Sequence, residues 1–178
     1  IGAMLDFSLS QDVACSIRYP KTAAAEISRE LQPIELGKSE TLRTGTDGTI
    51  VVCGVSLANA LEAAEILQSE GLDVGVVNAR FVKPIDTEMI RQTLANSKFV
   101  ITVEEANLMG GFGSAFLESA NEMGLNASKV RRIGIPDEFV EHQSRPEVLA
   151  SLKLDTEGIA ETCRAAAKNT QLKPHVAS

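Results

Sequence analysis

Short, continuously apolar runs alternate with longer amphipathic segments from residue 49 onward. Runs that are apolar at every position predict strands buried on both faces of a sheet, whereas apolar residues spaced three or four apart predict helices. The predicted strands are 49–53, 74–77, 98–103 and 130–135. The predicted helices begin after Ser56, Asp86, the glycine run 110–113, Ser144 and Asp155.

The residues at the ends of these segments support the helices. Ser56, Asp86 and Asp155 have side chains that typically accept hydrogen bonds from a first helical turn. The stretch 144–147 reads Ser-Arg-Pro-Glu, which has the spacing of a capping box with a proline inside the first turn. Gly71 predicts the end of the first of these helices, because glycine readily adopts the positive φ that commonly terminates a helix.

Strands that alternate with helices in this way predict an α/β fold, with a mostly parallel sheet covered by helices on both faces. Residues 34–42 predict an edge strand that turns through 44–48, in addition to the four core strands. Farther upstream, alternating apolar residues over 12–18 predict another strand, which Pro20 would close because proline has no backbone N–H.

Composition narrows the class of protein. The 178 residues include 17 basic and 24 acidic side chains, a net charge of -7 without a cationic run, which argues against nucleic acid as a partner. No stretch approaches the ~20 apolar residues that a membrane span needs. Cys15, Cys53 and Cys163 lie far apart, which suits neither a zinc site nor a disulfide framework and favours a reducing, cytoplasmic location.

The first seven residues are apolar at near-helical spacing, with no preceding cap and no initiator Met. We therefore interpret the chain as a fragment of a longer protein.

Candidate chemistry should lie beyond the carboxyl ends of the strands, where open α/β sheets bind ligands. Glu104 and Glu105 form one candidate pair, but adjacent strand residues face opposite ways and cannot both reach one substrate. The glycine run 110–113 could cradle a phosphate, although it fails the dinucleotide fingerprint and favours tight packing at a helix start. His142 is more typical of a surface loop residue than of a catalyst.

Arg18 and Arg80 are stronger candidates. Each ends a predicted strand and is followed by an aromatic residue and, close by, a proline. An arginine fixed by rigid neighbours can hold a phosphate through two parallel hydrogen bonds. A salt bridge to one of the many carboxylates explains the same pattern, and the pattern alone does not separate the two.

These segments resemble the C-terminal part of the 1-deoxy-D-xylulose-5-phosphate synthase family, within the transketolase superfamily. The Arg-Phe-Val-Lys-Pro and Pro-Asp-Glu-Phe blocks are fairly specific to the synthase, whereas the glutamate pair and the glycine run also occur in 2-oxo-acid dehydrogenase E1 β subunits. The matching stretches follow the family's order and are 16–21, 76–86, 103–105, 109–115, 133–142 and 152–159.

The resemblance implies a reaction and a set of partners. Synthases of this family condense pyruvate with glyceraldehyde 3-phosphate, release CO2 and use thiamine diphosphate with Mg²⁺. They are homodimers of three-domain subunits and supply isoprenoid and thiamine biosynthesis. The third domain is a small α/β domain with a mostly parallel five-stranded sheet, which agrees with the predicted strands.

By the same resemblance, Arg18 and Arg80 match the arginines that hold the triose phosphate, and His142 and Glu104 are secondary candidates. Residues 1–20 would end the preceding pyrimidine-binding domain, 21–33 a linker, 34–167 the transketolase C-terminal-like domain and 168–178 a polar tail. The two arginines would then clamp one phosphate across the domain boundary.

The family's cofactor, metal and catalytic residues belong to the two other domains, so none is expected here. We therefore expect this chain to be inactive by itself. Two alternatives remain at this point, namely the C-terminal domain of a 2-oxo-acid dehydrogenase E1 β subunit acting as an assembly module, and a free-standing α/β domain that binds a small anion.

Overall fold

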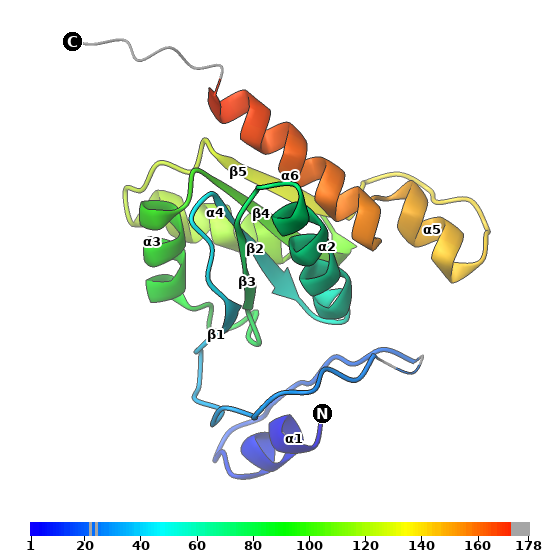
Figure 1. Cartoon of the computed structure of the whole chain (residues 1–178). Helices are drawn as coiled ribbons and strands as arrows, with labels where there is room; N and C mark the ends of the chain where they lie inside the picture. Colours follow the sequence, from blue (N-terminus) through cyan, green and yellow to red (C-terminus); the bar gives the residue numbers. More distant parts are fainter. Residues whose placement is uncertain (22, 24, 172–178) are drawn as a thin grey trace.

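The chain folds around one five-stranded sheet in the order β1-β3-β2-β4-β5 in this computed structural model, which describes residues 1–21, 23 and 25–171 (Figure 1). β1 runs antiparallel to β3, and all other neighbouring strands are parallel. The strands are β1 (Glu40–Arg43), β2 (Gly48–Cys53), β3 (Val74–Asn78), β4 (Phe99–Asn107) and β5 (Val130–Ile135). The α/β class and the four predicted core strands are confirmed.

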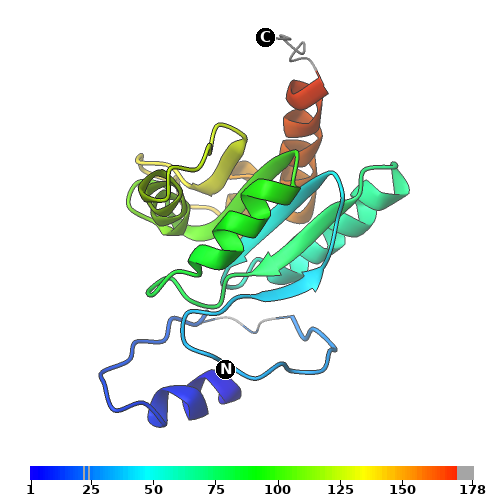
Figure 2. The same cartoon turned by 90° about the vertical axis from the view of Figure 1, so that its left-hand side faces the viewer.

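Helices cover both faces of the sheet, as Figure 2 shows. α2 and α6 pack on one face and α3 and α4 on the other, while α1 lies apart from the sheet near the N-terminus. The helices are α1 (Gly2–Leu9), α2 (Leu57–Ser69), α3 (Thr87–Asn96), α4 (Phe112–Glu122), α5 (Arg145–Ser151) and α6 (Thr156–Gln171). The predicted tail from residue 168 is helical through Gln171, and its remainder lies outside the described residues.

The central strand β2 explains why the core has two parts. Ile50 and Val52 pack with α2 and α6, whereas Val51 packs with α3 and α4. Successive strand residues point to opposite faces, so a strand between two helical layers must be apolar at every position. This is the physical origin of the continuous apolar runs in the sequence.

Most of the predicted helix ends are confirmed. The Asp86 side chain accepts a hydrogen bond from the Met89 N–H at 3.0 Å, and Ser144 and Glu147 form the capping box. Gly71 follows α2 with a φ of 84°. Ser56 occupies the N-cap position of α2, but its side chain makes no capping bond. Its backbone (ψ 9°) is not in the extended region that directs a cap side chain over the first turn.

The predicted edge strand 34–42 is shorter in the structure, where β1 contains only Glu40–Arg43. Gly37, with a φ of 68°, turns the chain just before it. Ser39 then donates its backbone N–H and its hydroxyl to Asp86, at 2.8 and 2.9 Å. The backbone ahead of β1 is therefore bound to a helix cap instead of to β3.

The predicted strand 12–18 is wrong. These residues form neither helix nor strand, and Val13 and Cys15 are exposed. Alternating apolar residues form a strand only where another strand accepts and donates backbone hydrogen bonds. Within the described residues, no segment pairs with 12–18.

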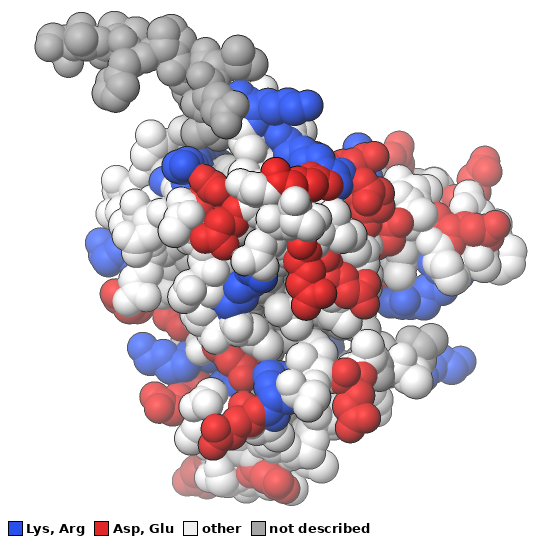
Figure 3. All heavy atoms as spheres, in the orientation of Figure 1, with Lys and Arg blue, Asp and Glu red and all other residues white. Residues whose placement is uncertain are grey.

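No helix among residues 1–21, 23 and 25–171 is both long and apolar enough to cross a membrane. On the face shown in Figure 3, acidic and basic side chains are interspersed.

Two phenylalanines test how far stability depends on the layer of α3 and α4. Phe116 on α4 is fully buried, so we expect Phe116→Ala to lower the free energy of unfolding by about 3–5 kcal/mol. Phe139 lies fully exposed in the loop after β5, so Phe139→Ala should change it by less than about 0.5 kcal/mol. Urea denaturation of the two variants measures both values, and equal midpoints would contradict this description of the core.

Candidate functional site

The carboxyl ends of β2, β3, β4 and β5 lie at one edge of the sheet, because these strands are parallel. The N-terminal segment runs along this edge, as Figures 1 and 2 show. The ring of Phe7 on α1 meets the ring of Phe81 edge-on, with centroids 5.7 Å apart. The segment that precedes the sheet therefore packs directly on the loop that follows β3.

Arg80 lies in that loop, two residues after the end of β3. Its backbone adopts a φ of 56°, a left-handed conformation that few residues other than glycine adopt. Its side chain is only 8% exposed. The guanidinium forms a 3.1 Å salt bridge with Glu40, and it donates to the carbonyl oxygens of Gln32 and Pro33 at 3.3 and 3.1 Å. The salt bridge that the sequence left open as an alternative is thus present for Arg80.

Arg18 is exposed and lies on the N-terminal segment. Burial and then the negative charge of Glu104 raise the pKa of the Cys53 thiol to about 11, while the positive charge of Arg18 opposes that rise. Cys53 is the last residue of β2, so the charge of Arg18 acts at the carboxyl end of this strand. β2 is the direct neighbour of β3. The two arginines therefore come from segments that meet at the same edge, and their joint role in phosphate binding stays a prediction.

Glu104 has a different role from the one considered in the sequence. β4 continues through Asn107, so both glutamates lie within the strand. The Glu104 side chain is buried and accepts the backbone N–H groups of Phe112 and Gly113 at 2.6 and 2.7 Å. A Cβ on Gly111 would collide with a Glu104 oxygen, so glycine is needed there. The chain's own carboxylate thus occupies the helix N-terminus that a phosphate would need.

Glu105 points elsewhere, as the alternation along a strand requires. It forms a 2.6 Å salt bridge with Arg145 at the start of α5. Glu104 and Glu105 therefore bind separate partners. His142 is exposed in the loop between β5 and α5.

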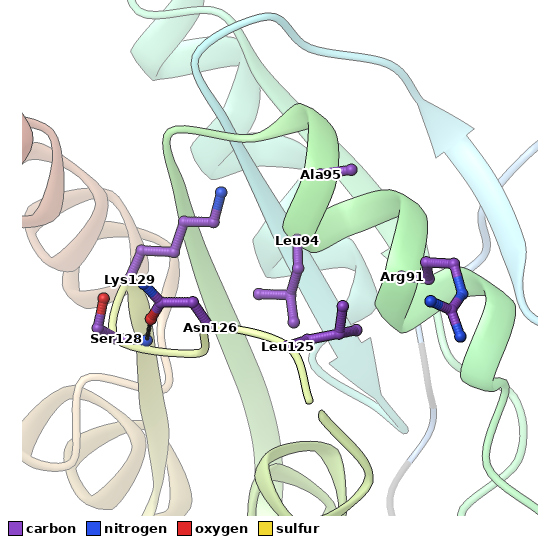
Figure 4. Close-up of a pocket in the computed structure, with 7 residues that line it drawn as sticks. All are labelled: Arg91, Leu94, Ala95, Leu125, Asn126, Ser128 and Lys129. Atoms are coloured by element: carbon purple, nitrogen blue, oxygen red, sulfur yellow. Dashed lines mark hydrogen bonds between the residues drawn. The ribbon is translucent and has the colours of Figure 1, made fainter. Parts of the chain in front are cut away.

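Two hollows in the surface are lined by neither Arg18 nor Arg80. The one in Figure 4 has a volume of about 270 Å³ and lies between the end of α3 and the turn that leads into β5. A second hollow of about 270 Å³ lies beside β1 and contains Ser39 and Asp86. The hollow in Figure 4 is lined by Arg91, Leu94, Ala95, Leu125, Asn126, Ser128 and Lys129.

The described part of the chain contains no group of three or more His, Cys, Asp or Glu side chains that could hold a metal ion. The buried carboxylates Glu40, Asp86 and Glu104 each bind donors of the protein itself.

This sheet order, with one antiparallel edge strand and helices on both faces, defines an α/β domain of the transketolase C-terminal type. The profile of the family described as "Transketolase, C-terminal domain" matches residues 37–159, and the chain belongs to this family.

The similar curated proteins are synthases. The chain is 52% identical over 167 residues to the 1-deoxy-D-xylulose-5-phosphate synthase of Rhodopirellula baltica, covering 94% of this chain and 26% of that protein. It is 43% identical to 1-deoxy-D-xylulose-5-phosphate synthase 1 of Geobacter sulfurreducens, covering 88% and 25%. These relatives favour the synthase resemblance over the E1 β alternative. The chain spans about a quarter of their length.

Solved structures confirm the fold. A split gene transketolase, whose structure is that of an inactive tetramer of beta subunits, is 32% identical in sequence to this chain. The two structures match with a TM-score of 0.74 over 83% of this chain and 48% of that one. The R525L mutant of Pichia stipitis transketolase is 20% identical, with a TM-score of 0.56 over 77% of this chain and 19% of that one, and shows the shared fold alone.

The neighbouring glutamates provide a matched test of the site's architecture. We expect Glu104→Ala to lower the free energy of unfolding by about 3 kcal/mol, because it leaves two N–H groups at the start of α4 without an acceptor. Glu105→Ala removes only a partly exposed ion pair and should change it by less than about 1 kcal/mol. Denaturant titration of both variants measures the difference, and a similar loss for the two would show that Glu104 does not stabilise α4.

Proposed function

We propose that this chain is the C-terminal part of a 1-deoxy-D-xylulose-5-phosphate synthase, which condenses pyruvate with glyceraldehyde 3-phosphate and releases CO2. The identity of 52% to the Rhodopirellula baltica protein supports this assignment. In this proposal residues 1–20 end a preceding domain, 21–33 link it to the next domain, and that domain extends from residue 34 to the end of α6 at Gln171.

The proposal assigns the phosphate of glyceraldehyde 3-phosphate to Arg18 and Arg80. The observation that supports it most is the buried Arg80 guanidinium, held at the carboxyl end of β3 on a left-handed backbone. Backbone strain of this kind is typical of functional sites. The carbonyls of Gln32 and Pro33 are neutral acceptors, and a phosphate oxygen can replace them because a charge-assisted hydrogen bond is stronger.

Thiamine diphosphate with Mg²⁺ would supply the carbon nucleophile when bound. We assign its binding to those regions of the relatives that this chain does not span. The part proposed for this chain is to bind and orient the aldehyde substrate through its phosphate. We also propose that the chain functions within a homodimer, as the family resemblance implies.

We expect the purified chain to form no product from pyruvate and glyceraldehyde 3-phosphate, even with added thiamine diphosphate and Mg²⁺. The similar split gene transketolase is an inactive tetramer, which supports this expectation. Chromatographic detection of 1-deoxy-D-xylulose 5-phosphate measures the outcome. Product formation by the chain alone would contradict the proposal that cofactor binding belongs to regions outside this chain.

A hybrid enzyme tests the function itself. In this hybrid the chain replaces the matching 167-residue stretch of the Rhodopirellula baltica synthase, and we expect it to form 1-deoxy-D-xylulose 5-phosphate. Arg80→Ala in the hybrid should raise the KM for glyceraldehyde 3-phosphate about 30-fold, which corresponds to ~2 kcal/mol, because a buried charge-assisted contact is lost. The KM for pyruvate should stay within about twofold, since pyruvate has no phosphate.

The control is Arg91→Ala, which removes an exposed arginine of α3. Its guanidinium lies 3.9 Å from the carboxylate of Glu88, one turn away on the same helix. It should leave both KM values unchanged. A folded Arg80→Ala hybrid with an unaltered KM for glyceraldehyde 3-phosphate would refute the assignment of Arg80.

A further inference from the structure

Glu40 is a buried carboxylate at which several donors converge. It is the first residue of β1, and its side chain is only 4% exposed. It accepts two hydrogen bonds from the Nε and Nη2 of Arg29, each 3.0 Å long. Its Oε2 also lies 3.1 Å from the Nη2 of Arg80 and 3.3 Å from the Nδ2 of Asn78.

Glu40 binds the side chain of Arg80, and Asn78 binds its backbone. The strand register places Glu40 directly opposite Asn78. The Oδ1 of Asn78 accepts the backbone N–H of Arg80 at 3.2 Å, while the Nδ2 of Asn78 donates to Glu40. Since Glu40 also binds the Arg80 guanidinium, the three residues form a closed ring of contacts that includes both the backbone and the side chain of Arg80.

The charges in this cluster do not balance. Arg29 and Arg80 contribute two positive charges and Glu40 one negative charge, so one positive charge remains. Burial raises the pKa of Glu40, but the hydrogen bond from Arg29 and the charges of Arg80 and Arg29 lower it more, so the pKa lies below its usual value. Glu40 is therefore ionised at neutral pH, and the cluster still attracts an anion.

We infer that Glu40 is a positioning residue, which holds the Arg80 guanidinium in the orientation that binds the phosphate of the substrate, with Asn78 as its second support. This inference rests on the proposed function. A long arginine side chain loses rotamer freedom when it binds a ligand, and a side chain that is already held loses less. Arg29 in turn fixes Glu40 from the side of the N-terminal segment.

Glu40→Gln in the hybrid enzyme tests this role. We expect the KM for glyceraldehyde 3-phosphate to rise about tenfold, because the amide holds the guanidinium less firmly. The kcat and the KM for pyruvate should stay within about twofold, whereas loss of folded enzyme would lower kcat and leave KM unchanged. In the Arg80→Ala background the same substitution should have no further effect, since Glu40 acts through Arg80.

Glu70→Gln is the matched control. Glu70 also accepts two hydrogen bonds from one arginine, Arg164, both 2.8 Å long, but this pair joins α2 to α6 away from the carboxyl edge. The variant should leave the KM for glyceraldehyde 3-phosphate unchanged.

The outcomes separate the inference from the function on which it rests. A hybrid that forms no product, or an Arg80→Ala variant with unchanged KM, contradicts the proposed function. If Arg80→Ala raises KM but Glu40→Gln does not, or if the two effects add fully, the inference about Glu40 is wrong and the proposed function stands. Should Glu40→Gln lower the melting temperature too far to be assayed, Glu40→Asp and Asn78→Ala take its place. We expect each substitution to raise the KM for glyceraldehyde 3-phosphate by about three- to tenfold. If the KM stays unchanged in either variant, the inference is overturned.

Discussion

The parallel sheet imposes one constraint on this domain, which is that four strands end at the same edge and leave polar groups there to be satisfied. Buried carboxylates meet much of this requirement. Asp86 accepts donors from Ser39 and from the first turn of α3, and Glu104 accepts the first N–H groups of α4. Glu40 accepts the donors around Arg80. The loops at this edge are therefore held by charge-assisted hydrogen bonds, which are stronger than neutral ones.

The same carboxylates decide which groups remain available for a ligand. Because Glu104 occupies the N-terminus of α4, the glycine run serves close packing and is not available to a phosphate. Arg80 differs, because two of its three acceptors are backbone carbonyls of the N-terminal segment, which a more strongly charged acceptor can displace. An anion at this edge would thus compete with the chain's own backbone for one arginine. This competition links the proposed substrate site to the segment that precedes the sheet.

Local features of the fold could be predicted from the sequence with good accuracy. The sequence predicts the helix after Asp86 together with its cap, because a cap depends on residues a few positions apart. The predicted strand 12–18 was wrong, and the edge strand was predicted too long, because strand pairing depends on a distant partner. Ser56 shows a smaller limit, since a residue of the right type at the right position still needs the right backbone angles to cap a helix.

For the candidate site, too, some features follow from the sequence and others only from the tertiary structure. The order of apolar runs determined the class of fold and the edge at which ligands can bind, and the residues around Arg18 and Arg80 indicated the family. The partners of the charged side chains were decided only by the tertiary structure. Glu40 meets Arg80 because β1 pairs antiparallel with β3, and Glu104 meets Gly113 because the chain folds back after β4. These contacts join residues that are far apart along the chain or separated by a turn, and hydrophobic periodicity does not encode which buried charge will face which donor.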